Sequence, residues 1–279
     1  MQLNNEKPIH LNRQFFLVKQ LKMLPLFWVT LLVFARATAD NKTLSIQPRI
    51  FNGQETSSGT LGGIGVQIFY LKKLVCSGTI LSTRHILTAA HCFDVGNLQW
   101  FHVVAGNTKE YEGHTKTSTK NVLIKIKIHP DYNKEKFIGD IAVAKTLLVL
   151  KSNRVGYATI CHSQLFHKEF VTVAGWGIDG RTGLGVRNRL HTMRVPIVDR
   201  MPCEKAIGRT IPKNVICAGG YEHRTLCKGD SGGPLLLMNE VCGVGTWTYE
   251  CGESSKPDVF MSVKFYAKFI KNTMKSLGY

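Results

Sequence analysis

The stretch KGDSGGPLLL, residues 228–237, places an acid, a serine and two glycines ahead of a run of leucines. Two interpretations fit it. Ser231 is either a turn residue that precedes a strand, or a nucleophile on a backbone loop whose N–H groups also bind an oxyanion. The stretch alone does not decide between them, so the decision rests on the remainder of the chain.

The composition is typical of a folded globular protein, because 44% of the 279 residues are hydrophobic. The formal net charge is +17, but the lysines are scattered and are not massed with aromatic residues. We therefore expect a solvated basic surface and no nucleic-acid partner.

Eight cysteines lie downstream of an apolar N-terminal run, and an even number in an exported chain indicates disulfides. No two of them form a C-x-x-C pair, which argues against zinc. Glu110 and Glu112 are followed by threonines and lysines, a poor oxygen cage for calcium. We expect no metal and no cofactor.

The apolar run MLPLFWVTLLVF, residues 23–34, is shorter than the roughly 20 residues that span a bilayer. Small residues follow it up to Ala39, so we predict a signal peptide over 1–39 and a secreted, extracellular protein. The 22 residues before the run are long for the start of such a signal. A start at Met23 and an uncleaved membrane anchor therefore stay open.

Short runs rich in β-branched and apolar residues, separated by Gly, Asn, Asp and Pro, predict an all-β fold from Ile50 to about Met261. One run, NVLIKIKI, alternates, so we predict a half-buried strand with Lys125 and Lys127 on its outer face. The residues predicted to be buried are Val122, Ile124, Ile126 and Ile128. Only KFYAKFIKNTMKSL, residues 264–277, has helical spacing, which predicts a docked C-terminal helix.

Three short contexts hold the residue types of nucleophilic acyl transfer: LTAAHC around His91, GDIAVAK around Asp140 and GDSGGP around Ser231. Together with AGWG and KPDVF, they occur in the order and spacing of the chymotrypsin/trypsin family of serine proteases. Over residues 50–279 the chain resembles that family, whose triad serves as a general template for this chemistry.

The resemblance implies a secreted serine endopeptidase that is made as a zymogen. His91 would be the general base and then the general acid, Asp140 would orient it, and Ser231 would attack the scissile carbonyl. The N–H groups of Gly229 and Ser231 would form the oxyanion hole. Cleavage after Arg49 would free the amine of Ile50 to pair with Asp230.

The family's architecture implies two antiparallel six-stranded β-barrels, over about 50–155 and 156–262, followed by a short α-helix over 263–279. Residues 40–49 would be an activation propeptide. The family's disulfide pattern leaves no cysteine over. It implies the pairs Cys76–Cys92, Cys161–Cys242, Cys203–Cys217 and Cys227–Cys251.

The pocket for the side chain before the cut departs from the tryptic pattern. Thr225 stands where trypsin-like members have Asp, while Asp258 replaces a glycine of the back wall. Leu226 and Thr248 would narrow the entrance of this pocket. We favour small or medium aliphatic residues, and an atypical tryptic pocket that uses Asp258 stays open.

The resemblance also implies partners: protein or peptide substrates, an activating protease and protein inhibitors of proteases, acting on a monomer. The alternative function is a catalytically silent homologue that serves as a binding or regulatory module. Its attachment to polyanions would use the positive surface. The presence of all three triad residues and of the Arg49–Ile50 junction favours the enzyme.

Overall fold

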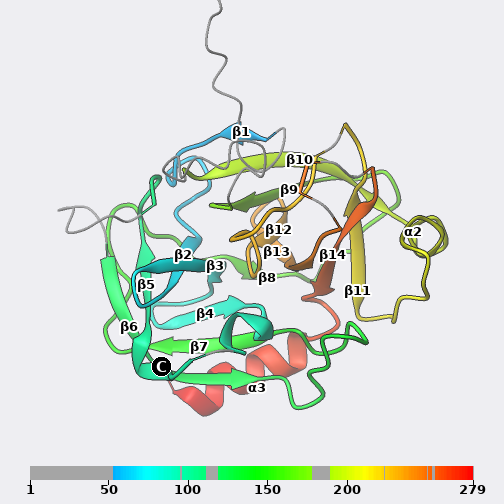
Figure 1. The fold of residues 1–279 in the computed structure, drawn as a ribbon. Coiled ribbons are helices and arrows are strands. Elements are labelled where there is room, and N and C mark those ends of the chain that lie inside the picture. The colour runs from blue at the N-terminus through cyan, green and yellow to red at the C-terminus, as the bar shows by residue number, and fades with distance from the viewer. Residues whose placement is uncertain are drawn as a thin grey trace, which may run out of the picture. The chain divides into compact units, whose positions relative to one another are not determined.

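The computed structural model describes residues 53–94, 96–110, 119–177, 189–222, 224–249, 251–252 and 255–278. Its main feature is a pair of closed antiparallel β-barrels of six strands each, as the family resemblance implies (Figure 1). No helix in these ranges is long and apolar enough to cross a membrane. The predicted signal peptide and propeptide lie outside the described residues.

The first barrel closes in the order β2-β3-β4-β7-β6-β5. Its strands are β2 (Gly65–Tyr70), β3 (Lys73–Ile80), β4 (His85–Thr88), β5 (Phe101–Ala105), β6 (Thr119–Ile128) and β7 (Ala142–Thr146). Two 3-10 helices, η1 (Ala90–Phe93) and η2 (Leu98–Trp100), lie between β4 and β5. Large side chains such as Ile68 and Phe101 are fully buried and contribute to the core of this barrel.

The second barrel runs β9-β10-β11-β14-β13-β12 and closes by pairing β12 with β9. Its strands are β9 (Phe170–Gly175), β10 (His191–Val198), β11 (Val215–Gly219), β12 (Pro234–Leu237), β13 (Glu240–Trp247) and β14 (Pro257–Ser262). Two short strands extend the sheet: β1 (Gln54–Glu55) pairs with β10, and β8 (Thr159–Ile160) runs parallel to β13.

The prediction for the alternating strand is wrong in its first half. Val122 and Ile124 are 42% and 37% exposed, whereas Leu123 between them is buried. A bulge between Leu123 and Lys125 is the physical reason, because the extra residue shifts the alternation by one position. Beyond the bulge, Ile126 faces the opposite way from the exposed Lys125, as predicted, while Ile128 at the strand end is 37% exposed.

A second helix, α2 (Arg200–Ile207), corrects the expectation that only the C-terminal segment is helical. It has eight residues and ends at Gly208, whose φ of 71° lies in the left-handed region. The disulfide from Cys203 to Cys217 ties it to β11. A helix this short depends on such tertiary attachment more than on its own periodicity, so its pattern was not recognised.

The C-terminal helix α3 (Ala267–Leu277) packs on β7 of the first barrel. Tyr266 just before it is 3% exposed, and its hydroxyl accepts a hydrogen bond of 2.8 Å from the backbone N–H of Gly139. At the other end of α3, the Lys145 ammonium donates to the Leu277 carbonyl at 2.6 Å. Contacts therefore hold the helix at both ends. The contact of Tyr266 also fixes Gly139, the residue that precedes Asp140.

The Tyr266 contact predicts a measurable loss of stability. Tyr266→Phe leaves the buried Gly139 N–H without its acceptor, which should cost about 1–3 kcal/mol of unfolding free energy in a denaturant titration. Tyr132→Phe is the matched control, because the Tyr132 hydroxyl also makes one hydrogen bond, of 3.0 Å to the Asp94 carboxylate, but this bond is exposed to solvent. Water replaces that bond, so we expect a change within about 0.5 kcal/mol. Equal losses in the two variants would contradict the interpretation.

Candidate active site

The structure brings His91 and Asp140 into direct contact. His91 lies in η1 just after β4, and Asp140 lies two residues before the start of β7, which pairs with β4. One carboxylate oxygen of Asp140 lies 2.8 Å from His91 Nδ1, and the other accepts the His91 backbone N–H at 2.9 Å. With the proton on Nδ1, this double contact orients the ring and leaves Nε2 free to accept a proton.

Ser231 lies on the turn that leads into β12, and this turn docks on the first barrel. The Ser231 carbonyl accepts the backbone N–H of Ser77 at 2.8 Å and lies 4.0 Å from Cys92 Sγ. The backbone of Ser231 is thus next to the residue that follows His91. Among the described residues, the Ser231 hydroxyl makes no hydrogen bond with the His91 ring, and such bonds are often loose without substrate.

Two buried residues that the sequence analysis did not single out hold this junction together. The hydroxyl of Ser77 on β3 donates to the Gly229 carbonyl at 2.9 Å. The hydroxyl of Thr88 on β4 donates in turn to the Ser77 carbonyl at 2.9 Å. In the sequence, Ser77 follows Cys76 and Thr88 lies within LTAAHC. Nothing in the sequence distinguishes a serine or threonine that holds such a junction from any other serine or threonine.

The backbone around Ser231 requires glycine. Gly229 and Gly232 have φ values of 101° and 80°, and a Cβ on Gly232 would clash with the Thr88 hydroxyl and the Ser77 carbonyl. The N–H groups of Gly229 and Ser231 donate to no acceptor within the described ranges. Both are therefore available to a ligand.

Asp230 is fully buried beneath the Ser231 turn. Its carboxylate accepts the backbone N–H groups of Gly177 at 2.6 Å and Cys227 at 2.8 Å, and no cation contacts it in the part of the chain that the structure describes. Burial raises the pKa of Asp230 to about 7, against the opposing effect of the two N–H groups. Arg49 and Ile50 lie outside the described residues.

The four predicted pocket residues come together below the Ser231 turn. The hydroxyl of Thr225 accepts the Gly252 N–H at 2.8 Å, and the carboxylate of Asp258 accepts the Leu226 N–H at 2.8 Å. Thr225, Leu226 and Asp258 are buried, and Thr248 is half-buried. Asp258 therefore lies within reach of the segment that precedes the serine.

The Asp258 carboxyl is only 1% exposed, and burial raises its pKa to about 7. The nearby Thr248 hydroxyl and the Leu226 N–H oppose this shift, while the charge of Asp230 adds to it. Neither Asp258 Oδ1 nor Thr248 Oγ1 has hydrogen-bond geometry with any atom of the described residues. The second carboxylate oxygen thus remains unsatisfied.

The disulfides join Cys76 to Cys92, Cys161 to Cys242, Cys203 to Cys217 and Cys227 to Cys251. These are the pairs that the family resemblance implies. Two clusters have metal-like spacing, Cys76–His91–Cys92 and Cys161–Glu240–Cys242, but their cysteines are disulfide-bonded and offer no thiolate. Cys76–Cys92 attaches the turn that carries His91 to β3, and Cys227–Cys251 joins the residue after Leu226 to the residue before Gly252.

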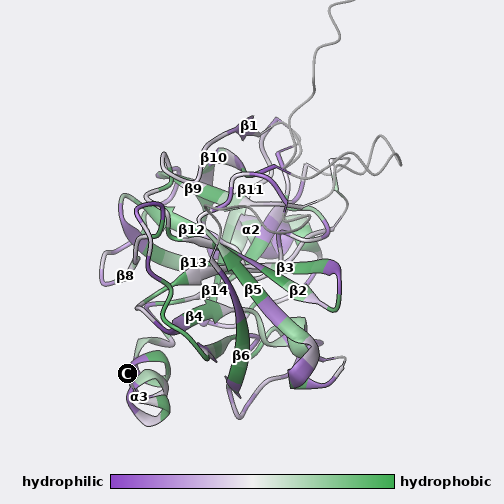
Figure 2. Cartoon of the chain, turned by 90° about the vertical axis from the view of Figure 1, so that its left-hand side faces the viewer, coloured by the Kyte–Doolittle hydropathy of each residue, from purple (hydrophilic) through white to green (hydrophobic). Residues whose placement is uncertain are grey.

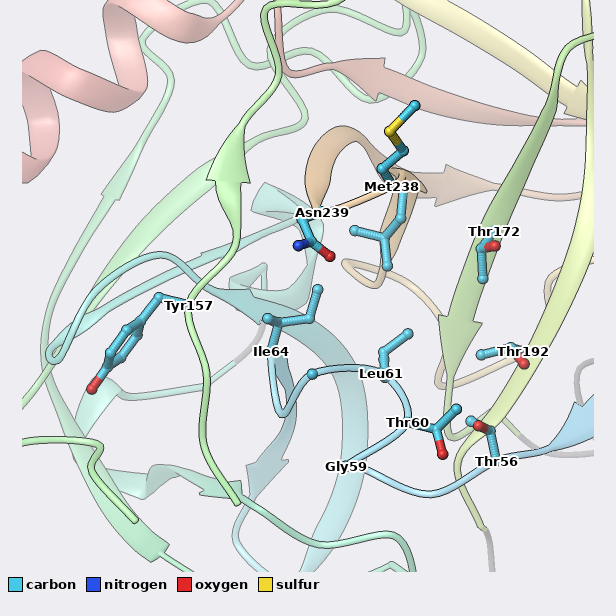
Figure 3. A pocket seen from close by; sticks show the side chains of 12 residues that line it. Thr56, Gly59, Thr60, Leu61, Ile64, Tyr157, Thr172, Thr192, Met238 and Asn239 are labelled. Atoms are coloured by element: carbon cyan, nitrogen blue, oxygen red, sulfur yellow. The ribbon is translucent and has the colours of Figure 1, made fainter. Parts of the chain in front are cut away.

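A separate pocket of about 450 Å³ lies elsewhere, lined by threonines, Tyr157, Asn239 and a few apolar residues (Figure 3). It contains none of His91, Asp140 and Ser231. No charged side chain and no histidine line it, so it has no counterpart of the contact between His91 and Asp140.

Comparison with known proteins decides the family. Residues 50–270 match the family model described as Trypsin. The chain belongs to the trypsin family. It is 34% identical over 205 residues to "Trypsin, alkaline C" of Manduca sexta, covering 71% of this chain and 78% of that protein. It is 27% identical over 236 residues to "Seminase" of Drosophila melanogaster, covering 83% and 84%.

A solved structure of neuropsin, a serine protease expressed in the limbic system of mouse brain, superposes on this trypsin-family chain with a TM-score of 0.71. The two are 25% identical, and the match covers 80% of this chain and 98% of neuropsin. The predicted family, fold class and enzyme class are confirmed: this is a chymotrypsin-like serine endopeptidase.

The buried carboxyl of Asp258 predicts a pH dependence of stability. Its pKa of about 7 in the folded state exceeds the ordinary value near 3.9, so the folded protein holds a proton that the unfolded chain has released. The bound proton on Asp258 stabilises the folded state. This contribution to the unfolding free energy is complete below about pH 4 and is lost as the pH rises toward 7. Asp258→Asn should flatten the fall in unfolding free energy between pH 4 and 7 by about 1.4 kcal/mol per pH unit.

The measurement is a urea titration at several pH values, with Ser231→Ala as background to prevent autolysis. Asp199→Asn is the control, because the Asp199 carboxylate is 63% exposed. It should leave the slope unchanged. A slope in Asp258→Asn equal to that of the parent would show that Asp258 ionises freely in the folded state.

Proposed function

We propose that His91, Asp140 and Ser231 are the catalytic residues of this endopeptidase. The Asp140 carboxylate holds the His91 ring through two contacts, and the docked turn brings Ser231 beside the same segment. In the reaction, His91 Nε2 takes the Ser231 proton as the hydroxyl attacks the scissile carbonyl, and then protonates the leaving amine. Water repeats the sequence on the acyl-enzyme, with His91 again as base. The double contact of Asp140 with His91 is the observation that carries this proposal.

The same proposal assigns the oxyanion hole to the N–H groups of Gly229 and Ser231. Both lack an acceptor among the described residues, and the glycine-dependent turn holds them beside the serine. Loss of one such donor in a related enzyme costs about 2.7–4 kcal/mol of transition-state stabilisation. The rigidity of this turn is therefore a catalytic requirement as well as a structural one.

Activation by cleavage after Arg49 is part of the proposal. Asp230 is a buried carboxylate whose pKa is raised because two backbone N–H groups only partly compensate for its burial. A free ammonium at Ile50 would supply the missing charge and lower that pKa. Asp230 adjoins Ser231 in the chain, so this pairing would stabilise the oxyanion-hole turn.

For the primary pocket we infer a preference for small or medium aliphatic side chains. Asp258 is enclosed and its carboxylate is bound to the Leu226 N–H, while the Thr225 hydroxyl is committed to Gly252. A lysine or arginine would need to reach a carboxyl that is 1% exposed and whose pKa is raised to about 7, so that a substantial fraction of it is protonated at pH 7. The atypical tryptic pocket is the alternative that the experiment below decides.

Export to the extracellular space agrees with the four disulfides, because such bonds persist in oxidising compartments. We accordingly propose a secreted, monomeric zymogen. Its partners are an activating protease, protein or peptide substrates, and protein inhibitors.

The triad assignment predicts that activity depends on Ser231 and on cleavage. Limited trypsin treatment should yield material whose N-terminal sequence begins at Ile50 and which hydrolyses a peptide library. Ser231→Ala, treated identically, should lose about a million-fold in kcat, because the nucleophile and its base act as a unit. Activity that survives in Ser231→Ala, or equal activity before and after the cut, would contradict the assignment. Inactivity of the correctly cleaved parent would favour the silent homologue.

The pocket assignment predicts that cleavage follows Val or Ala in preference to Lys or Arg. Because the carboxylate is shielded, Asp258→Asn should change the ratio of kcat/KM for Val over Lys substrates by less than about threefold, well below the 1–3 kcal/mol scale of pocket discrimination. A tenfold preference for Lys or Arg that disappears in Asp258→Asn would establish the tryptic alternative instead.

A further inference from the structure

Every charged residue of α3 is a lysine, so the outward face of this helix carries positive charge alone. Lys268, Lys271 and Lys275 recur at intervals of three and four residues, which places them along one side of the helix. The buried residues Ile270, Thr273 and Leu277 lie on the opposite side, against the barrel. All three lysines are exposed. In Figure 2, α3 carries both hydrophilic and hydrophobic segments.

Strand β6 extends this charge across the neighbouring sheet. The bond from Lys145 to the Leu277 carbonyl shows that α3 lies on the outer face of β7. Lys125 is directly opposite Lys145 in the β6–β7 pair, and Lys127 is opposite Val143. Opposite residues of an antiparallel pair project from the same face, so Lys125 and Lys127 flank α3. Both side chains are exposed.

We call Lys125, Lys127, Lys268, Lys271 and Lys275 the basic face. None of the five has a carboxylate partner in the described ranges, where every ion pair uses histidine or arginine as its cation. No acidic residue occurs between Asp258 and the end of the chain. Asp131 and Asp140 are the acids whose charges reach Tyr266, the residue just before α3. Surfaces usually mix both signs, so this face creates a net positive potential.

We propose that the basic face binds a linear sulfated polysaccharide. From Lys268 to Lys275 the helix rises about 10 Å, so a polyanion that runs along its axis would meet the lysines in turn. On α3 itself the other exposed positions are Asn272, between Lys271 and Lys275, and Ser276 after Lys275, so the helix lysines are not interleaved with exposed apolar side chains that could enter a bilayer. One aromatic side chain near the face is exposed, Phe265 before α3 at 58%, and a single ring does not make the row of aromatic side chains on which successive nucleic-acid bases stack.

The choice of a polysaccharide, which is extracellular, rests on the proposed export, whereas the charged surface itself does not depend on catalysis. No triad residue belongs to the basic face. Binding would therefore retain the protease near a sulfated matrix and leave its cleft open to substrate.

The experiment uses the uncleaved Ser231→Ala chain on immobilised heparin in a NaCl gradient, so that its outcome is independent of peptidase activity. Replacement of Lys268, Lys271 and Lys275 by Gln keeps helix propensity but removes three charges. We expect earlier elution, a salt slope lowered by about two to three, and affinity for heparin reduced at least about tenfold. The pair Lys125→Gln and Lys127→Gln, which leaves α3 intact, should shift elution in the same direction.

The matched control replaces Arg154, Lys168 and Lys205 by Gln, three exposed cations on segments outside α3 and β6. It removes the same charge and should elute close to the parent. Equal shifts in the control and in the α3 variant would mean that net charge alone drives retention, and would overturn the proposal. Tighter binding of the parent to single-stranded DNA or to phosphatidylserine vesicles than to heparin would overturn the choice of polysaccharide.

Discussion

The hydroxyl and backbone of Ser77 provide the contact on which the site depends. From β3 of the first barrel, Ser77 donates through its N–H to Ser231 and through its hydroxyl to Gly229, both in the turn of the second barrel. Thr88 restrains Ser77 from the adjacent strand. Because these groups are buried, leaving any of them unpaired would cost more than the bond itself contributes. The position of the proposed nucleophile relative to His91 is therefore fixed by the junction of the barrels.

Two buried carboxyls lie directly behind this junction. Asp230 and Asp258 are both enclosed, both have a pKa raised to about 7, and the charge of Asp230 raises that of Asp258 further. Each is bound by backbone N–H groups of the segment that leads to Ser231. Burial of these two carboxyls at the turn therefore costs electrostatic free energy, and an added cation would reduce that cost. The proposed activation and the proposed pocket chemistry would consequently be coupled through the same few residues.

The helix α3 combines two roles on opposite sides. Its inner side and Tyr266 anchor the residue before Asp140, while its outer side presents the lysines of the basic face. Docking against β7 also aligns α3 with Lys125 and Lys127 of β6. A surface feature assembled from distant segments therefore arises from the same packing that positions Asp140, the carboxylate of the proposed triad.

The sequence by itself determined the all-β class, the family and the positions of the proposed triad, because GDSGGP, LTAAHC and GDIAVAK are local patterns that survive without coordinates. It did not determine the outward position of Val122 and Ile124, since a bulge arises from strand pairing and leaves the alternating pattern unchanged. It also missed α2, Ser77 and Thr88. Only the tertiary structure decided how the barrels meet and whether Asp258 is enclosed, because burial and hydrogen-bond partners depend on segments far apart in the chain.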